Sequence, residues 1–339
     1  MARRKTIDVG LIGCSKRGLW YGALFDDVDP NAYAAIDPAT YHHMTYYGHV
    51  ELQTERCEGF RVAKVYDADA CAAERFAAAF RRPPEICERL EDVSGGVDLV
   101  FVANESGDGS DHRRLARPGL SKGVPTFIDR PLAASVKDAK GMLALAEKHG
   151  VPLLSCSHLR MLPHVHRFKS RFAEIGPIQM GVVKGCGSAP AQVCDAVELA
   201  LTLFDDEFPR GVASVRSMGA QPFEVMLLHY GRARGERTLN VLAVNGPFGG
   251  GTRTYFAKAV SHGNTVDSPP FDLFVQSEGG LGVLDAVKRM VRTGKPPLTH
   301  ADFIAPVAIL EAARAAHNQP EPVKVRGMPI AELRKLGDT

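Results

Sequence analysis

The stretch "IDVGLIGCSKRG" (residues 7–18) decides the fold of the N-terminal part of this chain. It begins as a short apolar run of strand length and continues into a loop bounded by Gly13 and Gly18. A dinucleotide-binding loop reads G-x-G-x-x-G, and here Ser15 takes the place of the middle glycine. Serine is small, and its hydroxyl can donate a hydrogen bond to a phosphate. The stretch therefore predicts a strand, a phosphate-binding loop and the start of a helix, with an ordinary glycine-rich turn as the alternative.

Two cations follow the serine and strengthen the first interpretation. Lys16 and Arg17 lie where a helix would begin, and a helix N-terminus already favours anions. We expect the whole loop to contact the pyrophosphate of a nucleotide, with the contacts made by Gly13, Cys14, Ser15, Lys16, Arg17 and Gly18.

Apolar runs and helical stretches alternate through the N-terminal part of the chain. The further runs of strand length are residues 60–67, 97–103, 124–129 and 151–155, and the helical stretches between them are residues 69–80, 110–123 and 135–150. Strands that are apolar on both faces and are separated by helices form a parallel sheet covered on both sides. We therefore predict an α/β fold with a doubly wound parallel sheet of the Rossmann type, and an insertion at about residues 26–59.

The pattern changes near residues 150–156. Residues 211–278 contain strand-like runs in succession, among them "PFEVMLLHY", "RTLNVLAVN" and "FDLFVQS". Strands without helices between them indicate a mostly antiparallel sheet. Residues 281–294 and 301–318 are expected to be closing helices, with a boundary or kink at Ala305-Pro306. We predict two domains, 1–153 and 154–339, of which the second is an α+β domain with a large, open sheet.

Composition narrows the class of protein. The formal net charge of +2 over 339 residues is close to balance, which disfavours a nucleic acid or an anionic membrane as partner. No apolar segment approaches the roughly 18–20 residues that a membrane span needs. The seven cysteines contain no C-x-x-C pair, which is typical of reduced thiols. These features predict a cytoplasmic protein.

Polar residues at the ends of the predicted strands are candidates for cofactor contacts. Asp67 ends the second strand, where an acid can accept both ribose hydroxyls of an adenosine and repel a 2′-phosphate. It therefore favours NAD over NADP, although it lies far beyond the usual spacing of about 20 residues from the loop. Asn104 follows the third strand, and His112 follows Asn104. We predict that both contact the cofactor, with a surface or capping role as the alternative for His112.

The insertion contains a group of histidines, His42, His43 and His49. Their spacing fits no familiar set of metal ligands, and no cysteine or carboxylate joins them. We therefore predict no metal, and we interpret the insertion as a structural or substrate-covering loop.

The stretch "FIDRPLA" (127–133) ends another predicted strand on an acid, Asp129, and a cation, Arg130, followed by Pro131. With these residues the sequence resembles the glucose–fructose oxidoreductase, inositol dehydrogenase and MocA (Gfo/Idh/MocA) family over nearly the whole chain. The resemblance implies a Rossmann domain, a C-terminal sheet that serves as an oligomer interface in a homodimer or homotetramer, and oxidation or reduction of a sugar, inositol or related polyol with NAD(P). "FIDRPLA" falls where the family usually has Glu-Lys-Pro, so Asp129 is implied to face the nicotinamide ribose and Arg130 the substrate hydroxyl.

The sequence departs from the family at the residues that usually manage the proton. The family lysine is replaced by Arg130, which cannot exchange a proton near neutral pH. The family also has an Asp and, four residues later, a His on a helix of the second domain. Here Asp195 is followed by Leu199. Asp195 is a catalytic candidate, with a helix N-cap as its alternative.

His158, in "SCSHLRMLP" (155–163), is a candidate for the replacement general base, because its intrinsic pKa is near neutral. Its alternative is a hydrogen-bonded linker histidine. Arg160, Lys184 and His229 are candidates for binding substrate oxygens, with structural or solvated positions as alternatives.

The sequence therefore predicts an NAD-dependent oxidoreductase acting on a sugar-like or cyclitol-like polyol. Two rivals follow from the altered motifs. One is a family member that uses transient oxidation for elimination, epimerisation or glycosidic cleavage. The other is a non-catalytic nucleotide-binding subunit.

Overall fold

The structure of the protein is a computed structural model that describes residues 6–38, 56–103, 107–207, 211–220, 223–231, 239–246 and 254–326. The chain forms two compact units. The first contains residues 1–129, 140–155 and 280–297, and the second contains residues 130–139, 156–279 and 298–339.

This division differs from the predicted boundary at residues 153/154 in two places. Residues 130–139 belong to the second unit, and residues 280–297 belong to the first. The second difference has a packing reason. The ammonium of Lys288 lies 5.3 Å from the ring centre of Phe60, and the Cys57 thiol donates to the Asp285 carboxylate over 3.3 Å. A segment distant in sequence therefore completes the first unit.

The first unit contains the predicted doubly wound sheet. Its strands are β1 (Ile7–Ile12), β2 (Phe60–Tyr66), β3 (Glu85–Ile86), β4 (Leu99–Val102), β5 (Thr126–Ile128) and β6 (Leu153–Ser155), all parallel, in the spatial order β3-β2-β1-β4-β5-β6. This is the strand order of a Rossmann fold, which reverses direction between β1 and β4. Ligands of such sheets bind beyond the carboxyl ends of the strands at that reversal. The short strand β3 is the one strand of this sheet that the sequence did not predict.

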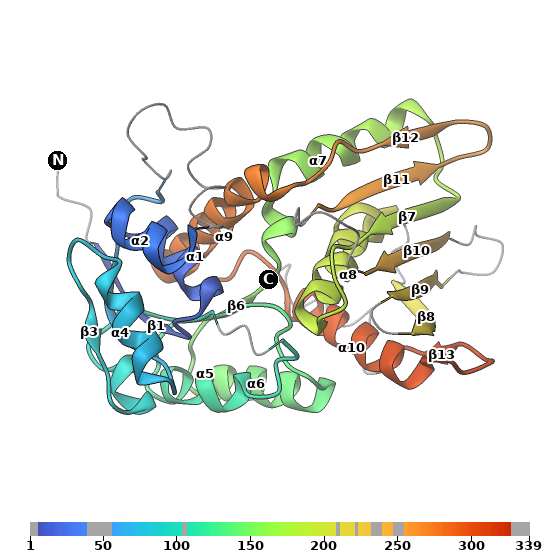
Figure 1. Cartoon of the computed structure of the whole chain (residues 1–339). Coiled ribbons are helices and arrows are strands. Elements are labelled where there is room, and N and C mark those ends of the chain that lie inside the picture. The colour runs from blue at the N-terminus through green and yellow to red at the C-terminus, as the bar shows by residue number, and fades with distance from the viewer. Residues whose placement is uncertain are drawn as a thin grey trace. The chain divides into compact units, whose positions relative to one another are not determined.

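Helices cover both faces of the first sheet. Figure 1 shows α1 (Lys16–Phe25) and α9 (Leu273–Thr293) on one face, and α5 (His112–Ser121) and α6 (Val136–Lys148) on the other. Two more helices of this unit are α2 (Pro30–Ile36) and α4 (Ala70–Ala78). The strands β4, β5 and β6 are buried along their whole length. Burial on both faces explains why these strands are continuous apolar runs in the sequence.

The second unit contains the predicted open sheet. Its strands are β7 (Met180–Lys184), β8 (Val212–Ala220), β9 (Phe223–Tyr230), β10 (Leu239–Asn245), β11 (Phe256–Val260), β12 (Thr265–Asp267) and β13 (Val323–Lys324), in the order β12-β11-β7-β10-β9-β8-β13. All neighbours are antiparallel except β7 and β10. The other elements of this unit are η2 (His158–Met161), α7 (Pro163–Ser170), η3 (Arg171–Glu174), α8 (Pro190–Phe204), η4 (Asp205–Glu207) and α10 (His300–Ala316).

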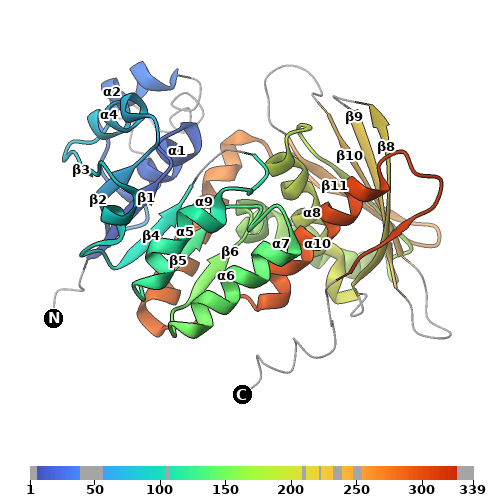
Figure 2. The same ribbon diagram turned by 90° about the horizontal axis from the view of Figure 1, so that it is seen from below.

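One face of this sheet is covered and the other is open. Figure 2 shows α8 and α10 lying on one face. The ring of Phe204 of α8 packs so closely on Gly181 of β7 that a Cβ at this glycine would lie 2.6 Å from it. Residues alternate along β9, where Met226 and Leu228 face the helices and are fully buried while Phe223 on the opposite face is 51% exposed. Period-two alternation of this kind is what a sheet with one solvated face requires.

Two predicted features of the C-terminal part were wrong. Residues 271–277, predicted as a strand, contain the start of α9 at Leu273, because the Asp272 carboxylate accepts hydrogen bonds from the backbone N–H groups of Phe274 and Val275. Pro306 lies inside α10, which continues on both sides of it. The predicted boundary at Ala305-Pro306 is therefore absent from this helix, and the alternative of a kink there stays a prediction.

Candidate functional site

The glycine loop follows β1 at the reversal of the first sheet. Gly13 has a φ of +93°, which favours glycine, and a Cβ on Gly18 would lie 1.9 Å from the Gly13 carbonyl oxygen. Both outer glycines are therefore required by the turn. Ser15 is the N-cap residue of α1, yet its Oγ makes no capping bond and is buried without a hydrogen-bond partner among the described residues. A buried hydroxyl left without a partner at this position fits a phosphate oxygen as its acceptor.

Asp67 follows β2 and lies against the same loop. Its Oδ2 accepts a hydrogen bond from the backbone N–H of Cys14 over 2.7 Å, and its Oδ1 accepts from the N–H of Asp69 over 2.9 Å. Each carboxylate oxygen can accept more than one hydrogen bond, so the group can still receive ribose hydroxyls. Burial, and next the charge of Asp67, raise the pKa of the Cys14 thiol, which is therefore neutral. The loop and Asp67 together fit the pyrophosphate and the ribose of a dinucleotide.

Of the predicted cofactor residues His112 and Asn104, the structure describes only the first. His112 is the first residue of α5 and is buried. Asn104 lies outside the described residues, and so do His42, His43 and His49 of the insertion. Within the described ranges, no group of three or more His, Cys, Asp or Glu side chains is arranged to hold a metal ion.

Arg17, which is predicted to contact the pyrophosphate, pairs with an acid at the end of another strand. Its guanidinium binds the fully buried carboxylate of Asp129, with Nε 2.8 Å from Oδ2 and Nη2 3.3 Å from Oδ1. The same group lies over the rings of Trp20 and Tyr21, 4.5 and 4.7 Å from their centres. The side chain is therefore directed toward the end of β5, where it compensates the charge of Asp129. The sequence did not predict this pair, because its members are far apart in the chain.

Arg130, the next residue, forms a buried cluster within the second unit. Its Nε donates to Oδ1 of Asp195 over 2.7 Å and its Nη2 donates to Oδ2 over 2.8 Å, which is a bidentate ion pair. Asp195 also accepts hydrogen bonds from Ser157 Oγ over 2.5 Å and from the Tyr255 hydroxyl over 3.1 Å. Asp195 lies inside α8, which begins at Pro190, so the alternative that it is the N-cap was wrong.

His158 belongs to the same cluster. Its Nδ1 lies 3.9 Å from Oδ1 of Asp195, and its Nε2 lies 3.2 Å from Oε1 of Gln276. The structure therefore brings together the three predicted catalytic residues Arg130, His158 and Asp195. Sequence reasoning missed Ser157, Tyr255 and Gln276, because nothing in the spacing of these residues connects them to Asp195.

Arg160, a predicted substrate ligand, pairs with two carboxylates. Its Nε donates to Oε2 of Glu198 over 3.0 Å and its Nη1 donates to Oδ1 of Asp302 over 3.1 Å. Burial lowers the pKa of Arg160, but the two carboxylates outweigh burial and raise the pKa above its usual range. Burial raises the pKa of Glu198 to about 7, although Arg160 opposes this shift. The signal that could have revealed Glu198 is an acid three residues after Asp195 in an otherwise apolar helix.

Lys184 and His229, the other predicted substrate ligands, lie on the open face of the second sheet. Lys184 donates from Nζ to the carbonyl oxygen of Thr254 over 3.1 Å, and Nδ1 of His229 lies 2.9 Å from Oδ1 of Asn240 on β10. Asp195 belongs to a helix on the opposite face of this sheet. Because side chains alternate between the faces of a strand, the structure does not bring these two residues to Asp195.

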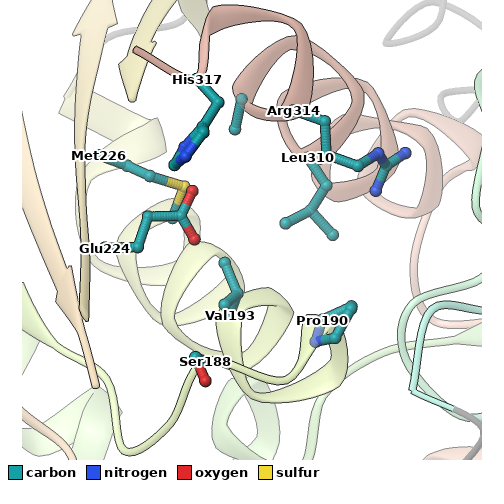
Figure 3. A pocket seen from close by; sticks show the side chains of 9 residues that line it. Ser188, Pro190, Val193, Glu224, Met226, Leu310, Arg314 and His317 are labelled. Atoms are coloured by element: carbon teal, nitrogen blue, oxygen red, sulfur yellow. The ribbon is translucent and has the colours of Figure 1, made fainter. Parts of the chain in front are cut away.

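A separate cavity of about 360 Å³ lies between α8, α10 and β9 in the second unit. It is lined by Ser188, Pro190, Val193, Glu224, Met226, Leu310, Ala313, Arg314 and His317. Figure 3 shows Glu224, Met226 and His317 on one side of it, with Pro190 and Arg314 on the other. Val193 precedes Asp195 by two residues, which is about 200° around a helix. The cavity is therefore on the other side of α8 from the Asp195 cluster.

Comparisons with known proteins agree with the Rossmann fold in the N-terminal part of the chain. Residues 39–157 match the sequence profile GFO_IDH_MocA, described as an oxidoreductase family with an NAD-binding Rossmann fold. The myo-inositol dehydrogenase Hyg17 of Streptomyces leeuwenhoekii is 25% identical over 145 residues, which cover 43% of this chain and 34% of that protein. The inositol 2-dehydrogenase of Serratia proteamaculans is 20% identical over 157 residues, which cover 46% of each. The chain thus matches less than half the length of these curated relatives.

The fold as a whole resembles solved structures. The myo-inositol dehydrogenase of Lactobacillus casei, solved with NAD(H) and myo-inositol, superposes with a TM-score of 0.70 at 15% identity and covers 96% of this chain and 98% of its own. At this identity the likeness concerns the fold alone. No helix among the described residues is long and apolar enough to cross a membrane. Over residues 39–157, the chain is thus similar to the Gfo/Idh/MocA oxidoreductase family, which is described as having an NAD-binding Rossmann fold.

Proposed function

We propose that the protein is an NAD-dependent oxidoreductase that transfers a hydride to or from a carbon of a sugar-like or cyclitol-like polyol. The observation that carries the proposal is the glycine loop with Asp67 beside it at the reversal of the first sheet, where Ser15 has a buried hydroxyl without a partner. The inositol dehydrogenases among the relatives and the fold neighbours support the choice of substrate class.

Several residues would hold the cofactor. Gly13, Ser15 and Lys16 would bind the pyrophosphate, and Asp67 the adenosine ribose. His112, Asn104 and Asp129 would complete the contacts, with Arg17 compensating the charge of Asp129. The cofactor, when bound, supplies the hydride acceptor or donor.

The cluster around Arg130 would manage the substrate oxygen and its proton. Asp195 orients the guanidinium through Nε and Nη2, and we propose that the charge of Arg130 holds the oxygen and stabilises its developing charge. Asp195 accepts hydrogen bonds from Arg130, Ser157 and Tyr255, which hold its carboxylate in place. We propose His158 as the general base, because the intrinsic pKa of an imidazole is near neutral.

The first test uses Trp20, the single tryptophan of the chain, which lies in α1 two residues after the loop. Excitation of Trp20 during titration with NADH should give quenching and sensitised cofactor emission, and NADPH should give a weaker response. A panel of sugars and cyclitols would follow, with NADH formation as the readout. No response at millimolar cofactor would contradict the proposal, provided that absorbance of the denatured protein excludes retained nucleotide.

The same panel of sugars and cyclitols distinguishes between the two alternative functions. Reduced cofactor that forms but stays bound would indicate transient oxidation, as in a lyase, epimerase or glycosidase. Cofactor binding without any reduction would indicate a nucleotide-binding subunit.

We also propose that the protein is a homodimer or homotetramer assembled through the open face of the second sheet, and that it is cytoplasmic. Large apolar side chains on this face support the first point, since Met180, Met218, Phe223 and Phe256 are 42%, 45%, 51% and 39% exposed. The second point is supported by the cysteines, all seven of which are free thiols.

A further inference from the structure

His158 has a neighbour that no sequence motif indicated. Gln276 lies in the first turn of α9, and its Oε1 is 3.2 Å from Nε2 of His158. The amide nitrogen of Gln276 donates to the carbonyl oxygen of Phe271 over 3.1 Å. Both side chains are buried, with His158 2% and Gln276 6% exposed. Bulk water therefore cannot replace either hydrogen bond.

These two bonds fix which nitrogen of the imidazole carries the proton. The carbonyl oxygen of Phe271 can only accept, so the side-chain amide must present its NH2 group there and its oxygen to His158. An amide oxygen is also only an acceptor, so Nε2 of His158 must be a donor. A neutral imidazole with its proton on Nε2 has its lone pair on Nδ1. That is the nitrogen that lies 3.9 Å from Asp195.

Close packing of α9 on η2 holds this geometry in place. Gly279 follows Gln276 by three residues and therefore lies on the same side of the helix. A Cβ at Gly279 would lie 2.4 Å from the backbone carbonyl oxygen of His158. Only glycine allows the helix to approach this closely, and the approach brings the Gln276 amide to the ring.

We propose that Gln276 is a positioning residue that holds His158 as the Nε2–H tautomer, so that Nδ1 is the nitrogen that accepts and returns the substrate proton. The inference rests on the proposed function. In the oxidation direction the O–H bond of the polyol breaks, the proton forms a bond to Nδ1, and the hydride leaves to NAD. The charged and titratable groups around the ring are Asp195, which would stabilise the imidazolium, with Arg130 and Tyr255 bonded to Asp195.

The test is the long-range ¹H–¹⁵N spectrum of the full-length protein with ¹⁵N-labelled histidine, recorded across pH and assigned with His158→Asn. We expect the neutral ring to carry its proton on Nε2. Gln276→Met keeps the volume but removes the acceptor, so the preference for this tautomer should fall. Gln276→Glu offers a carboxylate to Nε2–H, so the pH midpoint of the His158 titration should rise, and the pH profile of kcat/KM should move in the same direction. Gln179→Met, the same change at an exposed position, is the control and should alter neither readout.

Two results would overturn the inference. One is a neutral His158 with its proton on Nδ1, and the other is an unchanged tautomer in Gln276→Met. Turnover of a polyol together with either result would leave the proposed function intact and refute only the role of Gln276. The expected tautomer without turnover of any polyol would refute the proposed function instead.

Discussion

Arg130 shows how an arginine in place of a lysine changes the chemistry available to the residues beside it. A lysine at this position could exchange a proton, whereas the guanidinium stays charged and binds Asp195 through two parallel hydrogen bonds. That bidentate pair fixes the position of the carboxylate. Under the proposed function the proton is accepted by His158, whose Nδ1 lies 3.9 Å from the same carboxylate.

Asp67 gives a prediction about cofactor choice. Asp67→Asn keeps the shape and an acceptor for Cys14 but removes the charge, and hydrogen bonds to charged groups contribute about 1.5–3 kcal/mol. The affinity for NADH, measured by Trp20 quenching, should fall about tenfold or more, and the preference over NADPH should shrink. Asp69→Asn is the matched control, because Asp69 caps α4 instead of contacting the loop. Equal loss in both variants would argue against a ribose contact by Asp67.

Glu198 gives a prediction about stability and pH. Its pKa is about 7 in the folded protein against an ordinary value of 4.5. Between these values the folded state holds a proton that the unfolded state has released, so the free energy of unfolding should fall as the pH rises from about 4.5 to 7, by up to about 3 kcal/mol. In Glu198→Gln this part of the pH dependence should disappear.

The measurement for Glu198 is the unfolding temperature by calorimetry at a series of pH values. Glu174→Gln is the control, because Glu174 is an exposed carboxyl paired with Arg171. The same pH dependence in wild type and Glu198→Gln would show that Glu198 does not bind a proton in this range.

At the scale of elements, the contact between α9 and η2 determines where His158 lies. Gly279→Ala should force the helix away from the His158 carbonyl, because the added Cβ would lie 2.4 Å from it. We expect a loss of roughly 1–3 kcal/mol in stability, as for overpacking in a core, and a lower kcat. Calorimetry and steady-state kinetics would measure the two effects.

Gly141→Ala is the matched control for this prediction. Gly141 lies in the interior of α6, and a Cβ there would be 3.7 Å from the nearest atom, in Arg113, which is an ordinary contact. Alanine favours a helix over glycine by roughly 1 kcal/mol, so this variant should be slightly more stable. A Gly279→Ala protein as stable and active as Gly141→Ala would contradict the packing argument.

At the scale of the whole molecule, the open face of the second sheet carries the exposed apolar side chains of Met180, Met218, Phe223 and Phe256. A stable interface buries about 800 Å² on each partner and has an apolar centre. Phe223→Lys together with Met180→Lys should weaken assembly, because both side chains lie on this face. Analytical ultracentrifugation should show a shift toward the monomer.

Ile86→Lys is the control for assembly. Ile86 is also a large exposed apolar residue, at 42%, but it belongs to the first unit. An equal shift toward the monomer in Ile86→Lys and in the Phe223→Lys and Met180→Lys double variant would argue against the open face as the interface. So would the absence of a shift in both proteins.

The sequence by itself determined that the N-terminal part of the chain forms a parallel sheet of the Rossmann type. Runs that are apolar on both faces, separated by helices, specify a parallel sheet, and the loop at Gly13 and Gly18 identifies its ligand-binding edge. The Rossmann fold predicted from these residues was confirmed, and residues 39–157 match the model of the predicted family. These features depend on residues that are close together in the sequence. The spacing of those residues is therefore enough to predict them.

The tertiary structure alone decided the partners of the polar residues. Arg17 meets Asp129 across 112 positions, and His158 meets Gln276 across 118. It also placed Lys184 and His229 on the open face, because one position along a strand turns a side chain to the opposite face. Such pairings depend on how helices and strands pack, which no local pattern encodes. For that reason the sequence could name His158 and Asp195 as candidates, while only the fold showed that Arg130, Ser157 and Tyr255 all bond to the Asp195 carboxylate.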